Sequence, residues 1–138
     1  MPLPKLPDQQ AYFSMQINFY NFSVVAGNSK SKLSDNNVWS FVWTEADRPK
    51  SSNEITSGVY HVLSNVEYSE NITTVCLFCD GCGGQNKNST YMGMLCNWLY
   101  YFASPHIKHC EVIFPVVGHS FLPPDRVFGN IEKAVRKQ

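Results

Sequence analysis

A short apolar run at residues 73–79 (TTVCLFC) constrains the fold more than any other part of the sequence. Nearly uniform apolar character over so few residues is typical of a strand that is buried on both faces. The run ends abruptly at Asp80, and a glycine-rich turn follows at residues 81–84. Because strands of this kind occur in sheets covered by helices, the run predicts an α/β protein.

The rest of the chain supplies the partners that such a strand needs. Aromatic and β-branched residues predict a strand hairpin, and apolar residues at helical spacing predict helices between the later strands. The expected elements are strands at 12–26 and 38–43, a helix from Glu54 capped by Ser52 or Asn53, a deeply packed helix at 91–104 started by Ser89 or Thr90, a buried strand at 111–117, and a helix from about Asp125. We therefore expect one mixed β-sheet with an N-terminal hairpin and helices packed on it. Residues 1–11 are expected to be an extended segment because they are rich in proline, and residues 12–138 to be a single domain.

Charge and cysteine usage exclude several classes of protein. The 138 residues carry 11 basic and 11 acidic side chains, so the formal net charge is zero. This balance argues against a binder of polyanions that relies on bulk positive charge. The start of the chain has no apolar run typical of a signal peptide, and no apolar stretch is long enough to span a membrane. The five cysteines are odd in number and clustered, unlike the cysteines of a disulfide framework. We expect a nuclear or cytoplasmic protein that is neither secreted nor inserted in a membrane.

Three acids fall at ends of predicted elements. Asp80 ends a strand, whereas Glu54 and Asp125 each begin a helix. Each has a simple structural alternative, since Asp-Gly is a common turn and acids favour helix N-termini. Together they predict a cluster at one edge of the sheet, able to hold two Mg²⁺ or Mn²⁺ ions for phosphoryl transfer. His119, close to the last acid, is placed to move a proton or to orient Asp125, although a lone histidine is more often structural.

At this point the sequence resembles a known group of proteins. The order of elements is similar to the ribonuclease H-like (retroviral integrase-like) fold of DDE-type transposases. Residues 80–88 (DGCGGQNKN) and 118–125 (GHSFLPPD), continuing to Ile131-Glu132, resemble an uncharacterised domain family of transposon-derived genes in the same superfamily. Trp43-Thr-Glu45, Asn53-Glu54-Ile55, and the opening Pro-Leu-Pro with Tyr20-Asn21 extend this resemblance over nearly the whole chain.

The resemblance implies metal-dependent phosphodiester hydrolysis or strand transfer on DNA, with self-association as in transposases. By position, Glu54 matches the helix acid of the ribonuclease H set, Asp80 the strand aspartate and Asp125 the acid of the last helix. The chain departs from the pattern on its first strand, where the superfamily's nucleases have an aspartate and this sequence has Asn21. An asparagine carbonyl can ligate a metal but adds no charge, so a non-catalytic domain that binds nucleic acid or protein is the alternative.

Polar and basic residues near the acids are candidates for phosphate contacts. They are Gln85, Asn86, Lys87 and Asn88 after the glycines, and Arg126 and Lys133 in the last helix. The structural alternatives are a solvated loop with a helix cap, and basic residues that complement the helix dipole.

The cysteines suggest a third possibility, a small structural zinc module. Cys79, Cys82, His106 and His109 are the conceivable ligands, but the segment between the pairs is long and the His-x-x-His spacing is tighter than in zinc fingers. Cysteines of the core are the favoured interpretation. The final helix stops without a glycine or proline, and the chain opens with residues that lead into a strand. We therefore expect a piece of a longer transposase-like protein, truncated at its C-terminus.

Overall fold

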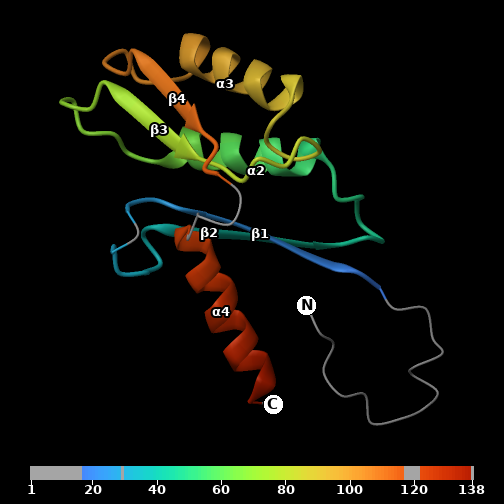
Figure 1. Ribbon diagram of the computed structural model, residues 1–138. Coiled ribbons are helices and arrows are strands. Elements are labelled where there is room, and N and C mark those ends of the chain that lie inside the picture. Colours follow the sequence, from blue (N-terminus) through green and yellow to red (C-terminus); the bar gives the residue numbers. More distant parts are fainter. Residues whose placement is uncertain (1–16, 29, 117–121, 138) are drawn as a thin grey trace, which may run out of the picture.

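The computed structural model describes residues 17–28, 30–116 and 122–137. Within them it shows a mixed α/β protein with two small sheets and three helices (Figure 1). The expected extended segment at residues 1–11 lies outside the described residues. The expectation of one continuous sheet is wrong for the described part, because its four strands form two separate two-stranded sheets.

The first sheet is the predicted hairpin with a shorter first strand. Of the strand expected at 12–26, residues 12–16 lie outside the described residues, and residues 17–18 precede the strand. Strands β1 (Phe19–Val25) and β2 (Val38–Thr44) pair antiparallel. Phe22 lies opposite Phe41, and their rings stack with centroids 5.9 Å apart. Ser23 is buried in this sheet, where its hydroxyl shares a 3.0 Å hydrogen bond with that of Ser40. Cross-strand aromatic pairing therefore stabilises the hairpin and presents a flat apolar face to the helix that follows.

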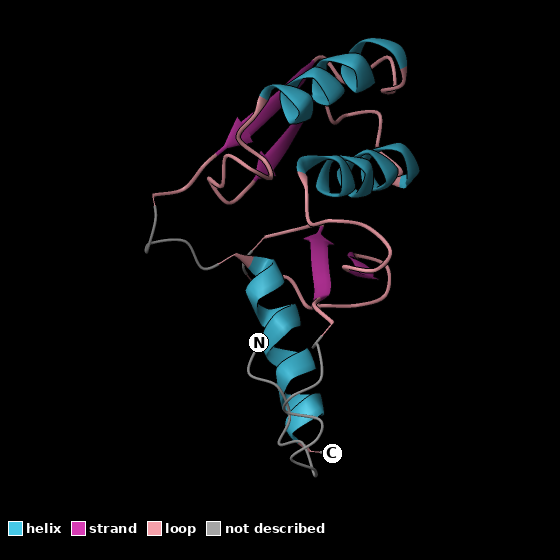
Figure 2. Cartoon of the chain, turned by 90° about the vertical axis from the view of Figure 1, so that its right-hand side faces the viewer, coloured by secondary structure: helices cyan, strands magenta, loops and turns pink. Residues whose placement is uncertain are grey.

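Helix α2 (Ser52–Asn65) packs against this face. It begins at Ser52 with Ser51 as the N-cap, so the predicted caps, Ser52 and Asn53, were each misplaced. Its buried residues include Ile55, Val59, Val62 and Leu63, which recur at helical spacing as predicted. Figure 2 shows α2 lying between the hairpin and the layer that holds the second sheet and its helix.

The second sheet is a parallel pair with a helical crossover. Strands β3 (Thr74–Phe78) and β4 (His109–Ile113) run side by side, and α3 (Ser89–Tyr101) connects them. The core forms where α2, α3 and this sheet meet: Val59, Leu63, Tyr91, Leu95, Trp98 and Ile107.

Burial in this layer is less complete than the sequence suggests. The predictions that β3 and β4 are buried on both faces are wrong, since Phe78 is 58% exposed and burial alternates along β4. The prediction of a deeply packed α3 is also wrong, since only one side of the helix is buried: Cys96 is exposed in its middle, and Tyr100 is 81% exposed in its last turn. A two-stranded sheet with a helix on one side can bury only one face of each element.

The last helix, α4 (Pro123–Arg136), contacts the hairpin rather than the second sheet. It begins two residues before the expected start at Asp125, with Pro123 and Pro124 in the first turn, where proline's missing N–H is not needed. Arg126 fixes the helix to the hairpin loop by donating a 2.8 Å hydrogen bond to the Ser31 carbonyl.

Candidate functional site

A cavity of about 810 Å³ is lined by residues of both sheets and is the centre of the candidate site. One wall is β1 and the residues after it, and the opposite wall is β3 with the residues that end it. Ile55, Val59, Val62 and Leu63 of α2 line it, and the first turn of α4 reaches it. Asn21, Asp80 and Asp125, far apart in the sequence, all line this one cavity.

Asp80 reaches the cavity because the strand ends beside it. The Cys79 N–H still bonds to the Ile113 carbonyl, which extends the pairing of β3 with β4 by one residue. The Asp80 carbonyl then accepts a 3.2 Å hydrogen bond from the side-chain amide of Asn86. No hydrogen bond to the Asp80 carboxylate is found among the described residues, so this charge is available to a ligand.

The loop after Asp80 is held by its own hydrogen bonds. The Cys82 carbonyl accepts from the N–H groups of Gln85, Asn86 and Lys87, at 3.0–3.1 Å. Asn88 is the N-cap of α3, accepting from the Tyr91 N–H and donating to the carbonyls of Gly83 and Gln85. The Ser52 hydroxyl links the start of α2 to this loop through Asn88 and the Gln85 carbonyl.

These hydrogen bonds distinguish structural from ligand-facing side chains among the four polar candidates of the loop, Gln85, Asn86, Lys87 and Asn88. The side chains of Asn86 and Asn88 hold the loop together, which favours their structural interpretation. Gln85 and Asn86 line the cavity, whereas Lys87 points its ammonium at the Phe114 ring, 5.5 Å from the centroid. Gln85 is therefore the member best placed to meet a ligand.

The structure places Glu54 at the start of α2, which is the structural alternative to its predicted site role. It forms a capping box with Ser51, accepting hydrogen bonds from the Ser51 hydroxyl and, at 3.2 Å, from the Ser51 N–H. The hydrogen bond from the Ser51 hydroxyl is the main cause that holds the pKa of Glu54 below its ordinary value. Glu54 does not line the cavity. Across residues 17–28, 30–116 and 122–137, no three Asp, Glu, His or Cys side chains form a group that could hold a metal ion.

Asp125 combines a structural bond with access to the cavity. Its Oδ2 accepts a 2.8 Å hydrogen bond from the Leu122 N–H at the start of α4. Asp125 is the acidic residue in the first turn of α4. Asn21 contributes a neutral amide from β1, directly opposite Val42.

The remaining predicted site residues lie elsewhere. His119 falls outside the described residues. Arg126 is engaged with Ser31, and Lys133 is exposed on α4, away from the cavity lining. Arg136 pairs with Glu132 at 2.6 Å on the same exposed helix, so part of its predicted basic character is neutralised.

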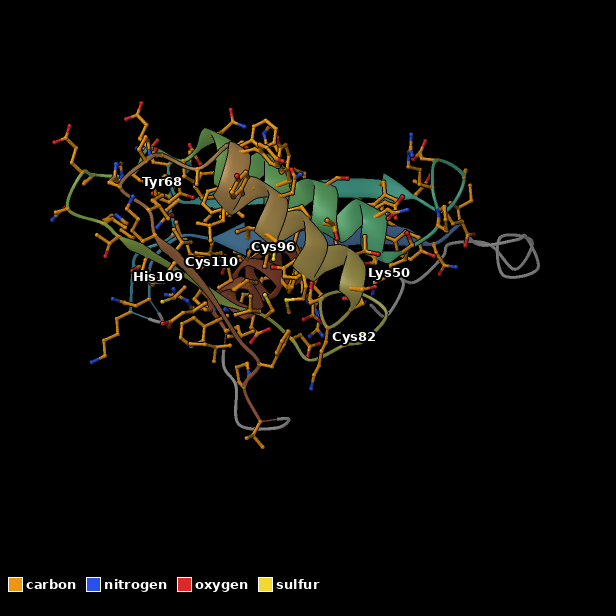
Figure 3. The ribbon with its side chains drawn as sticks, turned by 90° about the horizontal axis from the view of Figure 1, so that it is seen from above. Lys50, Tyr68, Cys82, Cys96, His109 and Cys110 are labelled. Carbon is orange, nitrogen blue, oxygen red and sulfur yellow. The ribbon has the colours of Figure 1, made fainter. Side chains whose placement is uncertain are left out.

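The zinc arrangement is not assembled by this fold. His109 lies beside Thr74 at the start of β3, and Cys79 follows the end of that strand. The five residues of extended chain from Thr74 to Cys79 place His109 and Cys79 roughly 16 Å apart, which is too far for both to bind one ion. Figure 3 shows Cys82 and His109 well apart. Burial raises the pKa of Cys79, whose sulfur also bonds to the Tyr91 hydroxyl at 3.2 Å.

Sequence reasoning missed two residues of the cavity lining, Trp43 and Lys50. Lys50 comes from the loop before α2, at the same end of the molecule as Cys82 (Figure 3). The indole N–H of Trp43 is buried and has no hydrogen-bond partner within the described residues. The position of Lys50 directly before the capping box was a sequence signal that could have marked it as a candidate site residue. The sequence gives no sign that the Trp43 indole N–H is left without a hydrogen-bond partner.

Comparison of the chain with protein-family models, with curated proteins and with solved structures finds no match. None of the helices in the described part of the chain combines the length and apolar character that crossing a membrane requires.

Proposed function

We propose that this chain is a transposon-derived, ribonuclease H-like domain that binds a divalent cation and acts on the phosphodiester backbone of DNA. The observation that carries the proposal is the convergence of Asn21, Asp80 and Asp125 on one cavity. These are three of the positions that the resemblance to the transposon-derived family assigns to a metal site. The fourth, Glu54, is used as a helix cap.

The chemistry of the donors fits one hard cation. Two carboxylates and one amide carbonyl are the oxygen ligands that Mg²⁺ and Mn²⁺ prefer, and two negative charges balance one divalent ion. Without Glu54 the set lacks the charge that would hold two ions. We therefore propose one Mg²⁺ or Mn²⁺ site, with Asp80 and Asp125 as the principal ligands and Asn21 as a neutral one. A bound ion would supply Lewis-acid activation of a phosphoryl oxygen.

The other lining residues suit a phosphate. Lys50 is the one basic side chain among the described residues of the lining, so it is the group there that can pair with a negatively charged ligand. The Gln85 amide can donate to a phosphate oxygen from the same loop that positions Asp80. In this arrangement the carboxylates hold the cation, while Lys50 and Gln85 orient the backbone.

A second candidate is a domain that binds nucleic acid or protein without turning it over. Two observations favour it: Asn21 brings no charge to the first strand, and the Glu54 carboxylate is engaged with Ser51. A site with one cation would still recognise a phosphate, because charge neutralisation needs less precise geometry than in-line attack.

A nicking assay separates these functions. Supercoiled plasmid is incubated with the protein and Mn²⁺, using Asp80→Asn as the test variant and Asp35→Asn as the matched control, since Asp35 is an exposed turn residue outside the cavity lining. Nicking by the native chain and by Asp35→Asn, with at least a hundredfold loss in Asp80→Asn, supports catalysis. Mn²⁺-dependent DNA binding without nicking supports the nucleic-acid-binding form of the second candidate. The absence of both rejects catalysis and DNA binding together, and leaves only the protein-binding form.

A further inference from the structure

The backbone of β1 is paired along one edge only. At the two ends of the hairpin, the Ala26 N–H bonds to the Asn37 carbonyl, and the Asn18 carbonyl accepts from the Glu45 N–H. Hydrogen-bonded residues alternate along an antiparallel strand, so the even-numbered residues of β1 bond to β2. The residues between them direct their backbone N–H and C=O groups to the free edge of the strand: Asn21, Ser23 and Val25.

Strand β3 also has a free edge. The Cys79 N–H donates to the Ile113 carbonyl, so Cys79 and the odd-numbered residues before it bond to β4. The backbone groups of Cys76 and Phe78 point the other way, toward an edge that pairs with no strand in the described part of the chain. Each sheet therefore has an unpaired row of donors and acceptors, which is a template for an added strand.

The two free edges face the same cavity. Its lining takes consecutive residues from both strands, 21–28 and 75–80, and no residue from β4. A strand contributes consecutive residues when its edge lines a cavity, because one face of a strand presents only every second residue. The cavity is therefore a slot between β1 and β3, with α2 and α4 on opposite sides of the hairpin (Figure 1).

The slot has space for one short strand. A strand residue in a packed sheet occupies roughly 160 Å³, given a rise of about 3.3 Å, a strand spacing of about 4.8 Å and a layer thickness of about 10 Å. The cavity volume of about 810 Å³ corresponds to about five such residues. The same length spans the part of β1 that lines the slot, from Asn21 to Val25.

The two sides of the slot differ in chemistry. On the side of α2, the lining side chains of the two strands are apolar and partly buried: Phe22, Val24, Val75 and Leu77. Alternation along the strands places Asn21 and Asp80 on the other side, where the first turn of α4 brings the exposed Asp125. The described lining holds these two carboxylates against one ammonium, that of Lys50, so this side favours basic side chains.

We propose that the slot binds an extended segment of a partner protein, about five residues long, in which apolar residues alternate with lysine or arginine. The backbone of this segment bonds to both free edges and joins the two sheets into one, so main-chain hydrogen bonds supply the affinity and alternate side chains the specificity. The inference goes beyond the proposed function, because the partner's basic side chains take the place of the cation at Asp80 and Asp125.

Fluorescence anisotropy tests the proposal with a labelled, end-capped peptide of the sequence Val-Lys-Val-Lys-Val, at low salt with EDTA. Two control peptides change one property each. N-methylation of the central valine removes a backbone donor and keeps every side chain, whereas Val-Glu-Val-Glu-Val reverses the charge. Each control should bind at least tenfold more weakly than the lysine peptide.

Each peptide also defines a result that contradicts the proposal. Equal binding of the N-methylated peptide would overturn strand pairing, and equal binding of the glutamate peptide would overturn the basic partner. A lysine peptide that does not bind at millimolar concentration would overturn the proposal as a whole. Because these titrations contain no divalent cation and no DNA, their failure leaves the proposed function standing.

A pair of protein variants locates the basic side chains. Asp80→Asn should weaken binding of the lysine peptide about fivefold. Asp35→Asn is the matched control, since Asp35 is an exposed turn residue outside the lining, and it should bind like the native chain. An Asp80→Asn variant that binds as well as Asp35→Asn would contradict the placement of the lysines.

Amide hydrogen exchange on the native chain, followed by NMR, reports on the edges themselves. The N–H groups of Val25 and Phe78 lie at the free edges, whereas those of Phe22 and Leu77 are paired within their sheets. The lysine peptide should slow exchange at Val25 and Phe78 at least tenfold, with a smaller effect at Phe22 and Leu77.

Protection of Val25 and Phe78 before the peptide is added would overturn the proposal. Protection that does not depend on protein concentration would mean that β1 and β3 pair directly or that the chain fills its own slot. Protection that rises with protein concentration would mean that a second copy fills it.

Discussion

Gly58 lies where α2 crosses the hairpin, and replacing it with alanine tests the packing of these two elements. A Cβ atom built at Gly58 would lie 3.0 Å and 3.2 Å from two atoms of the Phe22 ring and 3.3 Å from the Phe41 ring. These approaches are too close for ordinary contacts, and both rings are held by their mutual stacking. The substitution therefore forces the hairpin and the helix apart.

Two opposing effects set the size of the change. Alanine in a helix interior is favoured over glycine by about 1 kcal/mol, whereas overpacking costs about 1–3 kcal/mol. Gly58→Ala should therefore lower the free energy of unfolding by up to about 2 kcal/mol. Gly93→Ala in α3 is the matched control, since nothing lies within 4 Å of its added Cβ, and it should raise stability by about 1 kcal/mol.

Urea denaturation followed by circular dichroism measures both variants against the native chain. Because the helix-propensity gain is common to both, the difference between them isolates the packing term of about 1–3 kcal/mol. Equal stabilisation by the two substitutions would refute the reasoning, because it would mean that α2 does not rest on the Phe22 and Phe41 rings.

Three further outcomes follow from individual contacts. Ser51→Ala should cost about 1 kcal/mol of stability by thermal or urea unfolding, since it removes the N-cap of α2; an unchanged stability would contradict the capping box. Because the pKa of Glu54 is lowered by folding, its contribution to the free energy of unfolding is complete above the unfolded pKa near 4.5 and is lost as the pH falls through the lower folded pKa. Glu54→Gln should therefore flatten the acid limb of the stability–pH curve. An unaltered acid limb would exclude this role for Glu54. Iodoacetamide should label exposed Cys96 well before Cys110, because burial raises the pKa of the Cys110 thiol to about 11; mass spectrometry showing the reverse order would place Cys110 at the surface.

The hairpin and the helices were readable from the sequence because their signals are local. Alternating aromatic and β-branched residues determine β1 and β2, and the spacing of Ile55, Val59, Val62 and Leu63 determines the buried face of α2. Whether other elements cover one face of a strand or both is not a local property of its sequence. A uniform apolar run such as 73–79 has the same pattern whether one face or both are packed, so the exposure of Phe78 could not be predicted from it.

The residues of the candidate site also fall into those with a local sequence signal and those without one. Asp80 and Asp125 were predictable because a strand end and a helix start fix their places in the chain, and both line the cavity. Glu54 was predicted as a site acid, with a helix-start role as the alternative, and the structure places it in a capping box outside the cavity lining. The Ser51-x-x-Glu54 spacing of that box was present in the sequence. Trp43 was missed because a buried N–H without a partner depends on every neighbouring element at once.

The cation site is the central claim, and calorimetric titration with Mn²⁺ tests it most directly. The native chain should bind one equivalent, and Asp80→Ala and Asp125→Ala should each lose at least tenfold in affinity. Glu54→Ala should bind Mn²⁺ like the native chain, since its carboxylate caps α2 and does not line the cavity. No binding at millimolar Mn²⁺, or an Asp80→Ala variant that binds as well as the native chain, would contradict the account.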